Sequence, residues 1–330
     1  MNLLVTGGCG FIGSNFINYY FKENTNVNII NLDALYYCAS KLNINNEITE
    51  SERYNFIKGN LCSFDLIANI LEIYKINVVI HFAAQSHVQN SFSDALQYTL
   101  DNVVGTHTLL EACRKYNKLD KFIHISTDEV YGESMITESE EKKNEDSVLC
   151  PTNPYAATKA AAELMAKSYY HSFKMPIIIT RGNNVYGPNQ YPEKLIPRFI
   201  YQLINKEKVT IQGDGSNIRA FLHVDDVCSA LKIVLENGKI GEIYNIGSDY
   251  NQEYSVEEIA KILIKKIIKT DEYTDWIKYI EDRPFNDKRY YISNKKLKDL
   301  GWVIKKDFNK GLDELIELTK NDTYWNKFKL

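Results

Sequence analysis

Short apolar runs alternate with longer amphipathic stretches through the first half of the chain. Runs with the length of buried strands occupy residues 3–5, 27–32, 78–80, 122–125 and 177–179. Stretches with apolar residues at helical spacing occupy residues 11–21, 66–74, 102–113 and 155–170. Strands separated by helices are typical of βαβ units. The pattern therefore predicts an α/β fold built on a doubly wound, parallel Rossmann sheet.

The pattern changes after Arg181, where polar, loop-rich sequence replaces the regular alternation. Helical periodicity returns at residues 224–235, 256–268 and 312–319. We expect residues 1–180 to form a Rossmann domain and residues 181–330 to form a smaller, mixed, substrate-binding domain. The apolar run at 242–247 is predicted to be a strand that returns to the first sheet.

Composition and charge exclude several classes of protein. The formal net charge is -4 over 330 residues, so the chain lacks a basic field for nucleic acid or an anionic membrane. Any anionic ligand must then be held by local cations. The six cysteines lack metal-ligand spacing, so we expect no metal site. The chain begins with an apolar strand and no basic, signal-like segment, which favours a cytoplasmic protein.

Three glycines follow the first apolar run at once. Gly7, Gly10 and Gly13 are spaced Gly-x-x-Gly-x-x-Gly, at the start of a predicted helix. Such a turn brings backbone amides to a pyrophosphate at the helix N-terminus. A glycine triplet alone is weak evidence, because ordinary strand-to-helix turns use it too. Asp33, at the end of the second run, adds a carboxylate for the adenosine ribose, so the sequence predicts NAD rather than NADP.

A tyrosine and a lysine share one face of the helix predicted at 155–170. Asn153 and Pro154 suit the N-terminus of this helix, and Lys159 follows Tyr155 by one helical turn. A tyrosine base at neutral pH needs a pKa below the usual value of about 10. Lys159, the helix N-terminus and an oxidised nicotinamide would all lower the pKa of Tyr155. Without the glycine loop, the pair would be typical of an ordinary helix surface.

Two adjacent carboxylates, Asp128 and Glu129, follow the apolar run at 122–125. Neighbouring strand residues point to opposite faces, so both can serve one site only if the strand ends there. In open α/β sheets that edge is where ligands bind. Two close carboxylates drive their pKa values apart, which suits one acid and one base. By themselves, such residues would most often be solvated loop carboxylates.

These motifs resemble those of the nucleotide-diphospho-glucose 4,6-dehydratases, a branch of the extended short-chain dehydrogenase/reductase superfamily. The resemblance runs from Met1 to about Lys320 and is carried also by residues 81–88, 183–188, 192–197 and 282–287. Thr-Asp-Glu together with Tyr-x-x-x-Lys separates this branch from its epimerase and decarboxylase cousins.

The resemblance implies a catalytic cycle with tightly bound NAD. Tyr155, assisted by Thr127, would take the proton of the sugar 4-hydroxyl while carbon 4 is oxidised. Glu129 would then remove the proton on carbon 5, and Asp128 would protonate the departing 6-hydroxyl. Return of the hydride to carbon 6 would give the 4-keto-6-deoxy sugar nucleotide.

The resemblance also assigns side chains to each role. The implied catalytic residues are Thr127, Asp128, Glu129, Tyr155 and Lys159. The residues implied for NAD are Gly7, Gly10, Phe11, Ile12, Gly13, Asp33, Ala34, Leu35, Tyr36, Asn60, Leu61, Phe82, Ala83, Ala84, Tyr155 and Lys159. The residues implied for the substrate are Ser86, Thr127, Asn184, Lys194, Leu195, Arg219, Arg283 and Asn286.

Four departures from the bacterial deoxythymidine-diphosphate type bear on the nucleotide. Asn60 replaces a usual Asp, Gln85 a common Glu and Gln89 a common Asp, while Phe285-Asn286 replaces Gly-His. Segments 36–38, 181–190 and 283–287 are more similar to the plant and animal branch, which includes UDP-glucose dehydratase modules. We therefore expect UDP-glucose as the substrate, with dTDP-glucose as the alternative.

Two other functions stay open at this point. A UDP-sugar 4-epimerase borrows hydride in the same way but has no use for Asp128 and Glu129. A non-catalytic, NAD-binding regulatory protein would bind NAD without turning over sugar nucleotides. The resemblance also implies a homodimer, formed through the helices at 102–113 and 155–170.

Overall fold

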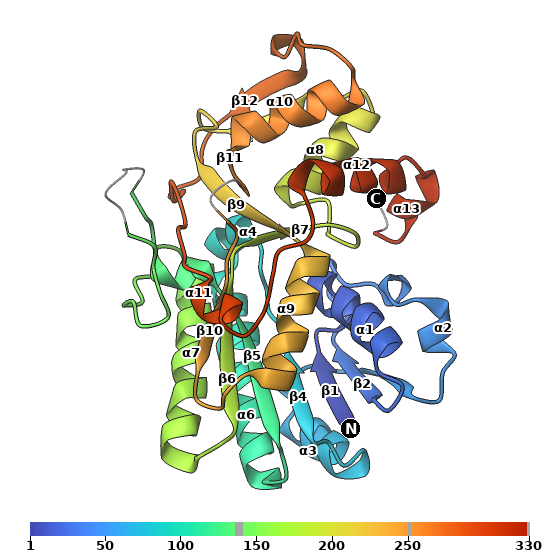
Figure 1. Ribbon diagram of the computed structural model, residues 1–330, viewed down its shortest axis with the longest axis vertical. Helices are drawn as coiled ribbons and strands as arrows, with labels where there is room; N and C mark the ends of the chain where they lie inside the picture. Colours follow the sequence, from blue (N-terminus) through green and yellow to red (C-terminus); the bar gives the residue numbers. More distant parts are fainter. Residues whose placement is uncertain (136–140, 250–251, 329–330) are drawn as a thin grey trace.

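One parallel sheet forms the centre of the molecule (Figure 1). The computed structural model describes residues 1–135, 141–249 and 252–328. The strand order of this sheet is β10-β6-β5-β4-β1-β2-β3. Its strands are β1 (Asn2–Thr6), β2 (Asn28–Asp33), β3 (Tyr54–Lys58), β4 (Val78–His81), β5 (Lys121–Thr127), β6 (Ile177–Gly182) and β10 (Ile243–Ile246). The order reverses between β1 and β4, so the predicted doubly wound Rossmann fold is confirmed.

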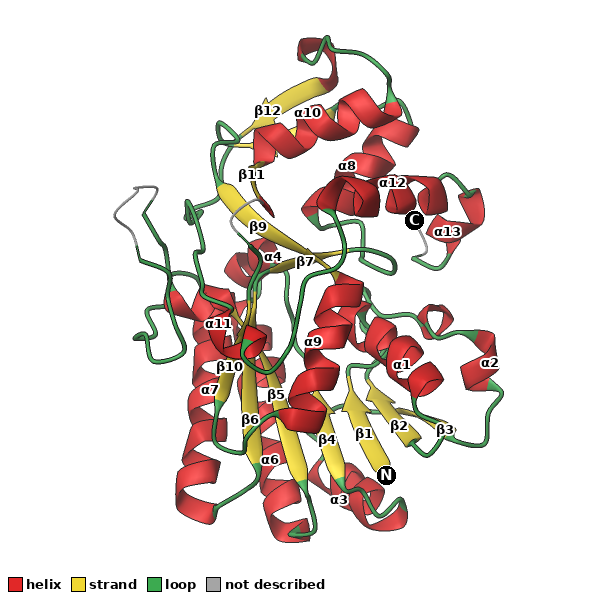
Figure 2. Cartoon of the chain, in the orientation of Figure 1, coloured by secondary structure: helices red, strands yellow, loops and turns green. Residues whose placement is uncertain are grey.

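Helices cover both faces of the sheet (Figure 2). One face carries α1 (Phe11–Glu23) and α9 (Val224–Asn237), which pack on each other. The opposite face carries α3 (Phe64–Ile73), α6 (Gly105–Tyr116) and α7 (Pro154–Phe173). Shorter segments are α2 (Asn46–Thr49), α4 (Val88–Ser93), α5 (Ala95–Tyr98), the π-helical turn η2 (Thr99–Val104) and the 3-10 turns η1 (Lys41–Asn43) and η3 (Asp128–Tyr131).

The strand alternation divides the interior into two cores. Leu3 and Val5 of β1 point to the core that contains α1 and α9, whereas Leu4 points to the core beneath α3 and α6. Neighbouring strand residues lie on opposite faces, and here both faces are covered. The strands therefore appear in the sequence as continuous apolar runs.

A smaller lobe lies beyond the carboxyl ends of the strands (Figure 1). Its strands are β7 (Asn184–Tyr186), β8 (Val209–Gln212), β9 (Ile218–His223), β11 (Glu253–Ser255) and β12 (Ile277–Ile280), paired as β11-β9-β7 and β12-β8. Its other elements are α8 (Leu195–Ile204), α10 (Val256–Ile267), η5 (Thr274–Trp276), α12 (Phe308–Thr319) and α13 (Asp322–Asn326). The short helix α11 (Lys295–Lys298) packs beside β10. The lobe encloses a third apolar core around Phe199 and Leu263.

The sequence pattern missed several strands of this structure. β3 is a five-residue edge strand, and the strands of the small lobe have three to six residues. Such short runs carry little periodicity. Both α9 and β10 lie beyond residue 180 yet belong to the layers of the large sheet, and the division of the chain into domains at that residue stays a prediction. Within the described ranges, no helix combines the length and apolar content needed to cross a bilayer.

A buried ion pair fastens β6 to α7. Arg181 and Glu163 are 1% and 0% exposed, and the Arg181 Nε donates to Glu163 Oε2 over 3.0 Å. The Arg181 Nη1 also donates to the hydroxyl of Tyr131 over 2.6 Å. Because neither charge can reach water, each depends on the other for its solvation.

Replacing Glu163 with Ala should therefore destabilise the fold strongly. The change leaves the Arg181 guanidinium buried without its counter-ion, which costs about 3–5 kcal/mol. The free energy of unfolding from denaturant titration measures this loss. Asp299→Ala is the matched control, because it breaks the exposed Lys295–Asp299 pair and should change stability little. Equal effects of the two changes would contradict the argument.

Candidate active site

The glycine loop after β1 leaves a concave space that side chains on the glycine positions would occupy. Gly7 has φ +73°, and a Cβ placed there would lie 2.6 Å from the Ala83 nitrogen. A Cβ on Gly13 would lie 2.4 Å from the Gly7 oxygen. Gly10 caps α1 without a side-chain hydrogen bond, so the first amides of the helix keep their donors free for an anion. The loop therefore fits a pyrophosphate.

Asp33 stands at the end of β2, beside this loop. Its Oδ2 accepts from the Cys9 amide over 2.9 Å, and its Oδ1 accepts from the Leu35 amide over 2.7 Å. These two bonds fix the orientation of a largely buried carboxylate that lines the pocket above the loop. The residues present fit a dinucleotide with an unphosphorylated ribose.

One pocket collects most of the residues that the sequence implied for NAD. Of the set given above, only Leu35 is outside the pocket lining, although its amide holds Asp33. Gln85, Ser126, Gln190 and Tyr191 line the same pocket and were not expected there. The assignment of these residues to NAD stays a prediction.

Tyr155 and Lys159 both line the cofactor pocket, on the first turns of α7. Asn153 caps the helix by accepting from the Ala156 amide over 2.8 Å. The Lys159 Nζ donates to the Ile125 carbonyl over 2.6 Å, and burial lowers the pKa of Lys159 to about 8. The pKa of Tyr155 is raised, by burial first and by the charge of Glu129 second. Burial therefore dominates the pKa of Tyr155 in the protein itself, and the predicted lowering, which includes the charge of an oxidised nicotinamide, stays a prediction.

The chain turns where β5 ends, which separates the two carboxylates. Thr127 is the last strand residue, and its hydroxyl accepts from the Glu129 amide over 3.3 Å to open the turn η3. The Asp128 Oδ2 accepts from the Asn183 side-chain amide over 2.6 Å. Asp128 is 3% exposed and lines neither pocket, whereas Glu129 faces the substrate pocket.

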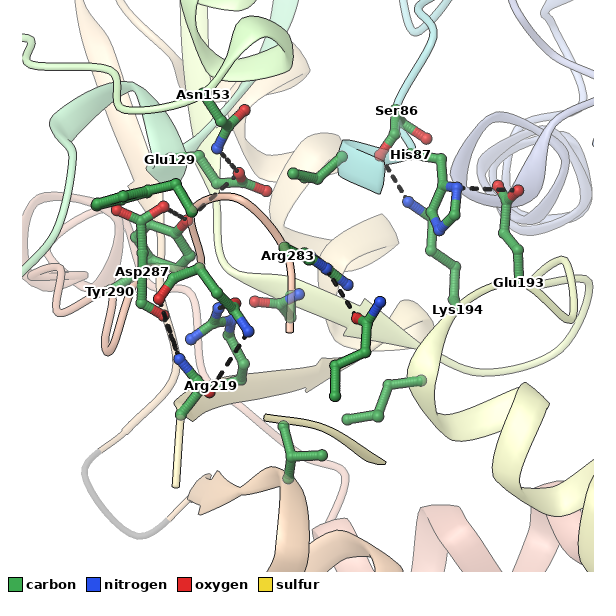
Figure 3. Close-up of a pocket in the computed structure, with 18 of the residues that line it drawn as sticks. Ser86, His87, Glu129, Asn153, Glu193, Lys194, Arg219, Arg283, Asp287 and Tyr290 are labelled. Carbon is green, nitrogen blue, oxygen red and sulfur yellow. Dashed lines mark hydrogen bonds and ion pairs between the residues drawn. The ribbon is translucent and has the colours of Figure 1, made fainter. Parts of the chain in front are cut away.

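The two carboxyl groups have different surroundings. Burial, and then the charge of Glu129, raises the pKa of Asp128 to about 7. Burial also raises the pKa of Glu129, while hydrogen bonding from Asn153 and the charge of Arg219 act against the rise. The Asn153 Nδ2 donates to Glu129 Oε2 over 3.1 Å (Figure 3). The raised pKa leaves a substantial fraction of Asp128 protonated near neutral pH, as a general acid requires.

A second pocket collects the residues that were implied for the substrate. Its lining contains Ser86, Asn184, Lys194, Leu195, Arg219, Arg283 and Asn286, but not Thr127. Thr127 is instead hydrogen-bonded to Tyr155, which lines the cofactor pocket. Ser86, Glu193 and Lys194 line both pockets, so a ligand in one lies next to a ligand in the other.

Positive charge concentrates in the substrate pocket. Burial, and then the charge of Arg219, lowers the pKa of Arg283, and burial and Arg283 together lower the pKa of Arg198. These guanidinium groups repel one another, and an anion between them would remove that repulsion. Arginine also offers paired donors that match phosphate oxygens. The arrangement fits a diphosphate.

Several residues that shape this pocket could not be predicted from local sequence patterns. Arg198 lies on α8 and lines the pocket, and no motif marked its position. The Tyr290 hydroxyl donates to Asp287 Oδ2 over 2.5 Å and lies 3.4 Å from Glu129 Oε2 (Figure 3). Glu193 and Asp287 belong to segments that carried the family resemblance, which was the only available signal for them.

Comparison with known proteins places the chain among relatives. A family described as GDP-mannose 4,6 dehydratase matches residues 4–315. The human protein named dTDP-D-glucose 4,6-dehydratase is 45% identical over 96% of this chain and 89% of its own length. A trifunctional UDP-glucose 4,6-dehydratase, epimerase and reductase of Arabidopsis thaliana is 43% identical over 98% of this chain, which spans 48% of that protein. The structure of dTDP-glucose 4,6-dehydratase from Bacillus anthracis in complex with NAD has a TM-score of 0.89, with 38% identity and 99% coverage of both chains.

The match over nearly the whole chain confirms the predicted family. The fold and the two adjoining pockets agree with a nucleotide sugar held beside a dinucleotide. The chain belongs to the nucleotide-sugar 4,6-dehydratases of the extended short-chain dehydrogenase/reductase superfamily, a family of NAD-dependent hydro-lyases.

Proposed function

We propose that this protein dehydrates UDP-glucose to the 4-keto-6-deoxy sugar nucleotide, at the junction of the two pockets. The observation that carries the proposal is the position of Glu129. It faces the cationic substrate pocket, one residue after Asp128, whose raised pKa favours the acid form, and its charge acts on Tyr155. A 4-epimerase has no step that needs an acid and a base beyond the tyrosine.

Each side chain has one task in this reaction. Bound NAD supplies the hydride acceptor and donor. Tyr155 takes the proton of the 4-hydroxyl, and Lys159 adds positive charge near the phenolate that forms. Glu129 removes the proton on carbon 5, which the ketone at carbon 4 has made acidic. Asp128 gives its proton to the departing 6-hydroxyl, so water leaves as a neutral molecule.

The cations hold the diphosphate. Lys194, Arg198, Arg219 and Arg283 surround the pocket, and the sugar ring would then lie toward Glu129 (Figure 3). The Arg219 Nη2 donates to Asn286 Oδ1 over 3.1 Å, and the Arg283 Nε donates to Gln212 Oε1 over 2.9 Å. These bonds orient both guanidinium groups before the substrate arrives.

Support for a uracil nucleotide comes from the segment around Phe285 and Asn286. Both residues line the substrate pocket, and the segment is more similar to the branch that includes the UDP-glucose dehydratase modules of plants, together with animal proteins named dTDP-D-glucose 4,6-dehydratase, than to the bacterial type. The Arabidopsis relative, named as a UDP-glucose 4,6-dehydratase, matches 98% of this chain. The preference should be small, because uracil and thymine differ by one methyl group.

A homodimer and a cytoplasmic location are further parts of the proposal. The surface around η2, α6 and α7 exposes the apolar side chains Leu100, Val104, Leu164 and Phe173. A second copy of this surface would cover them in a four-helix contact, as the family resemblance implies.

Mass spectrometry of the products tests the function and the nucleotide together. The protein is incubated with UDP-glucose or with dTDP-glucose, each with and without added NAD. We expect loss of one water from the substrate without net NADH, and a kcat/KM for UDP-glucose about fivefold above that for dTDP-glucose. Isomerisation at constant mass would instead identify an epimerase, and binding of NAD without turnover would identify a regulatory protein.

Glu129→Gln should stop the loss of water. The amide keeps the shape of the side chain but cannot take the proton on carbon 5, so kcat should fall by about 10²–10⁴-fold. The same mass assay measures the change. Glu72→Gln, at an exposed ion pair with Lys118, is the control and should keep full activity. Water loss at the normal rate in Glu129→Gln would exclude Glu129 as the base.

Asp128→Asn should change how stability depends on pH. The folded pKa of Asp128 is about 7 against a usual 3.8, so the carboxyl stabilises the fold fully only below pH 3.8. That contribution is lost as pH rises toward 7, whereas Asn has no proton to lose. Relative to the natural protein, the variant should gain roughly 1–3 kcal/mol between pH 5 and pH 8. Denaturant titrations at both pH values measure the gain, and parallel curves would contradict a raised pKa.

A further inference from the structure

Four side chains join across one wall of the cofactor pocket. Tyr36 follows β2, Asn60 follows β3, Gln85 follows β4, and Asp101 lies in the π-helical turn η2. All four line the pocket. They come from separate segments, so their meeting is a product of the fold and could not be seen in the sequence.

Asp101 is the centre of this group. The Tyr36 hydroxyl donates to Asp101 Oδ1 over 3.0 Å and accepts from the Asn60 Nδ2 over 3.0 Å. The Asp101 Oδ2 accepts from the Nε2 of Gln85 over 3.1 Å and from the Nε2 of Gln97 over 3.0 Å. Hydrogen bonds to a carboxylate are about twice as strong as those between neutral groups. We call Tyr36, Asn60, Gln85 and Asp101 the Asp101 strap.

The Asp101 strap separates the cofactor pocket from a further cavity, which is distinct from the substrate pocket. Tyr36 and Gln85 line both spaces. The further cavity is open and is completed by Tyr37, Asn90, Asp94, Gln97 and Tyr98. Because the wall between the two spaces consists of side chains, rotation of Tyr36 away from Asp101 would join them and open the cofactor pocket on this side.

One end of the Asp101 strap is fixed more firmly than the other. The Gln85 amide donates to Asn102 Oδ1 over 2.7 Å, and the Asn102 Nδ2 donates back to the Gln85 carbonyl over 3.0 Å. The same Nδ2 donates to Thr158 on α7 over 2.9 Å. Tyr36, by contrast, is 37% exposed and reaches Asp101 only through its hydroxyl. The Gln85 end of the strap is therefore held by several hydrogen bonds, whereas the Tyr36 end is held to Asp101 by one.

Two of the four residues are departures from the bacterial pattern. At position 85 a glutamate could not donate to Asp101 and would repel it, whereas Gln85 donates to it. At position 60 a carboxylate could not donate to the Tyr36 hydroxyl, whereas Asn60 does. The amides at both positions thus build the strap around a single carboxylate.

We propose that the Asp101 strap is a kinetic barrier to the exchange of NAD, with Asp101 as its positioning residue. The proposal rests on the proposed function only in placing NAD in this pocket. The hydrogen bonds of the strap close this side of the cofactor pocket, so passage of NAD on this side requires them to open for entry and for release alike. Loss of Asp101 should then raise both rates, while the dissociation constant changes much less.

Asp101→Asn tests the proposal, because an amide at this position loses the charge and one of the two acceptors. Release of radiolabelled NAD into excess unlabelled NAD should become about tenfold faster, and the dissociation constant should change less than about threefold. Tyr36→Phe should act alike, and the double variant should release NAD no faster than either single variant. Asp94→Asn, on the neighbouring open cavity, is the control and should match the natural protein.

Three results would overturn the proposal. The first is release at the natural rate in both variants. The second is a dissociation constant that rises in step with the release rate, which would make Asp101 an ordinary ligand contact. The third is a natural protein that binds no NAD, which would overturn the kinetic barrier and the proposed function together. If both variants release NAD faster as expected but the natural protein converts no sugar nucleotide, the kinetic barrier is supported and only the proposed function is overturned. The two proposals can therefore be distinguished.

Discussion

The position at which β5 stops determines the chemistry of the whole site. Thr127 ends the strand and caps the turn that follows, so Asp128 and Glu129 leave the alternation of the sheet. One carboxyl then meets Asn183 and the other meets the substrate pocket. If β5 continued by two more residues, the strand alternation would direct one of these two carboxylates into the helices that cover a sheet face, away from the reacting sugar.

The buried charged groups near the active site are of two kinds, those with an oppositely charged partner and those without one. Arg181 and Glu163 neutralise each other in the interior, and the pair holds β6 to α7. Asp128 and Lys159 are buried without such a partner, so the pKa of each moves toward neutrality. Burying a charge without a partner destabilises the fold. The same burial shifts the pKa of the group toward 7, where the group can both give and take a proton. Stability and catalysis thus use different buried groups at the end of β5, on the adjacent strand β6 and on α7.

The sequence predicts those parts of the fold and site that have local causes. The glycine loop, the cap at Asn153 and the Tyr155–Lys159 spacing each follow from neighbours in the chain. Arg198 and Tyr290 enter the site through contacts between distant segments, so no local pattern could reveal them. Asn183 lies in a segment that carried the family resemblance, but its bond to Asp128 joins residues 55 positions apart. The burial that raises the pKa of Tyr155 could not be predicted for the same reason, since it depends on the packed structure. β3 was missed because five residues at a sheet edge carry too little periodicity.

Lys194 connects the two lobes across the site. It caps α8 in the small lobe, and its Nζ donates to the Ser86 carbonyl, beyond β4 in the large lobe, over 2.6 Å. The bond lies between both pockets, so any hinge motion that parts the lobes must break it. An anion competes with that carbonyl for the ammonium group. Binding of an anion at Lys194 would therefore weaken a bond that joins the two lobes.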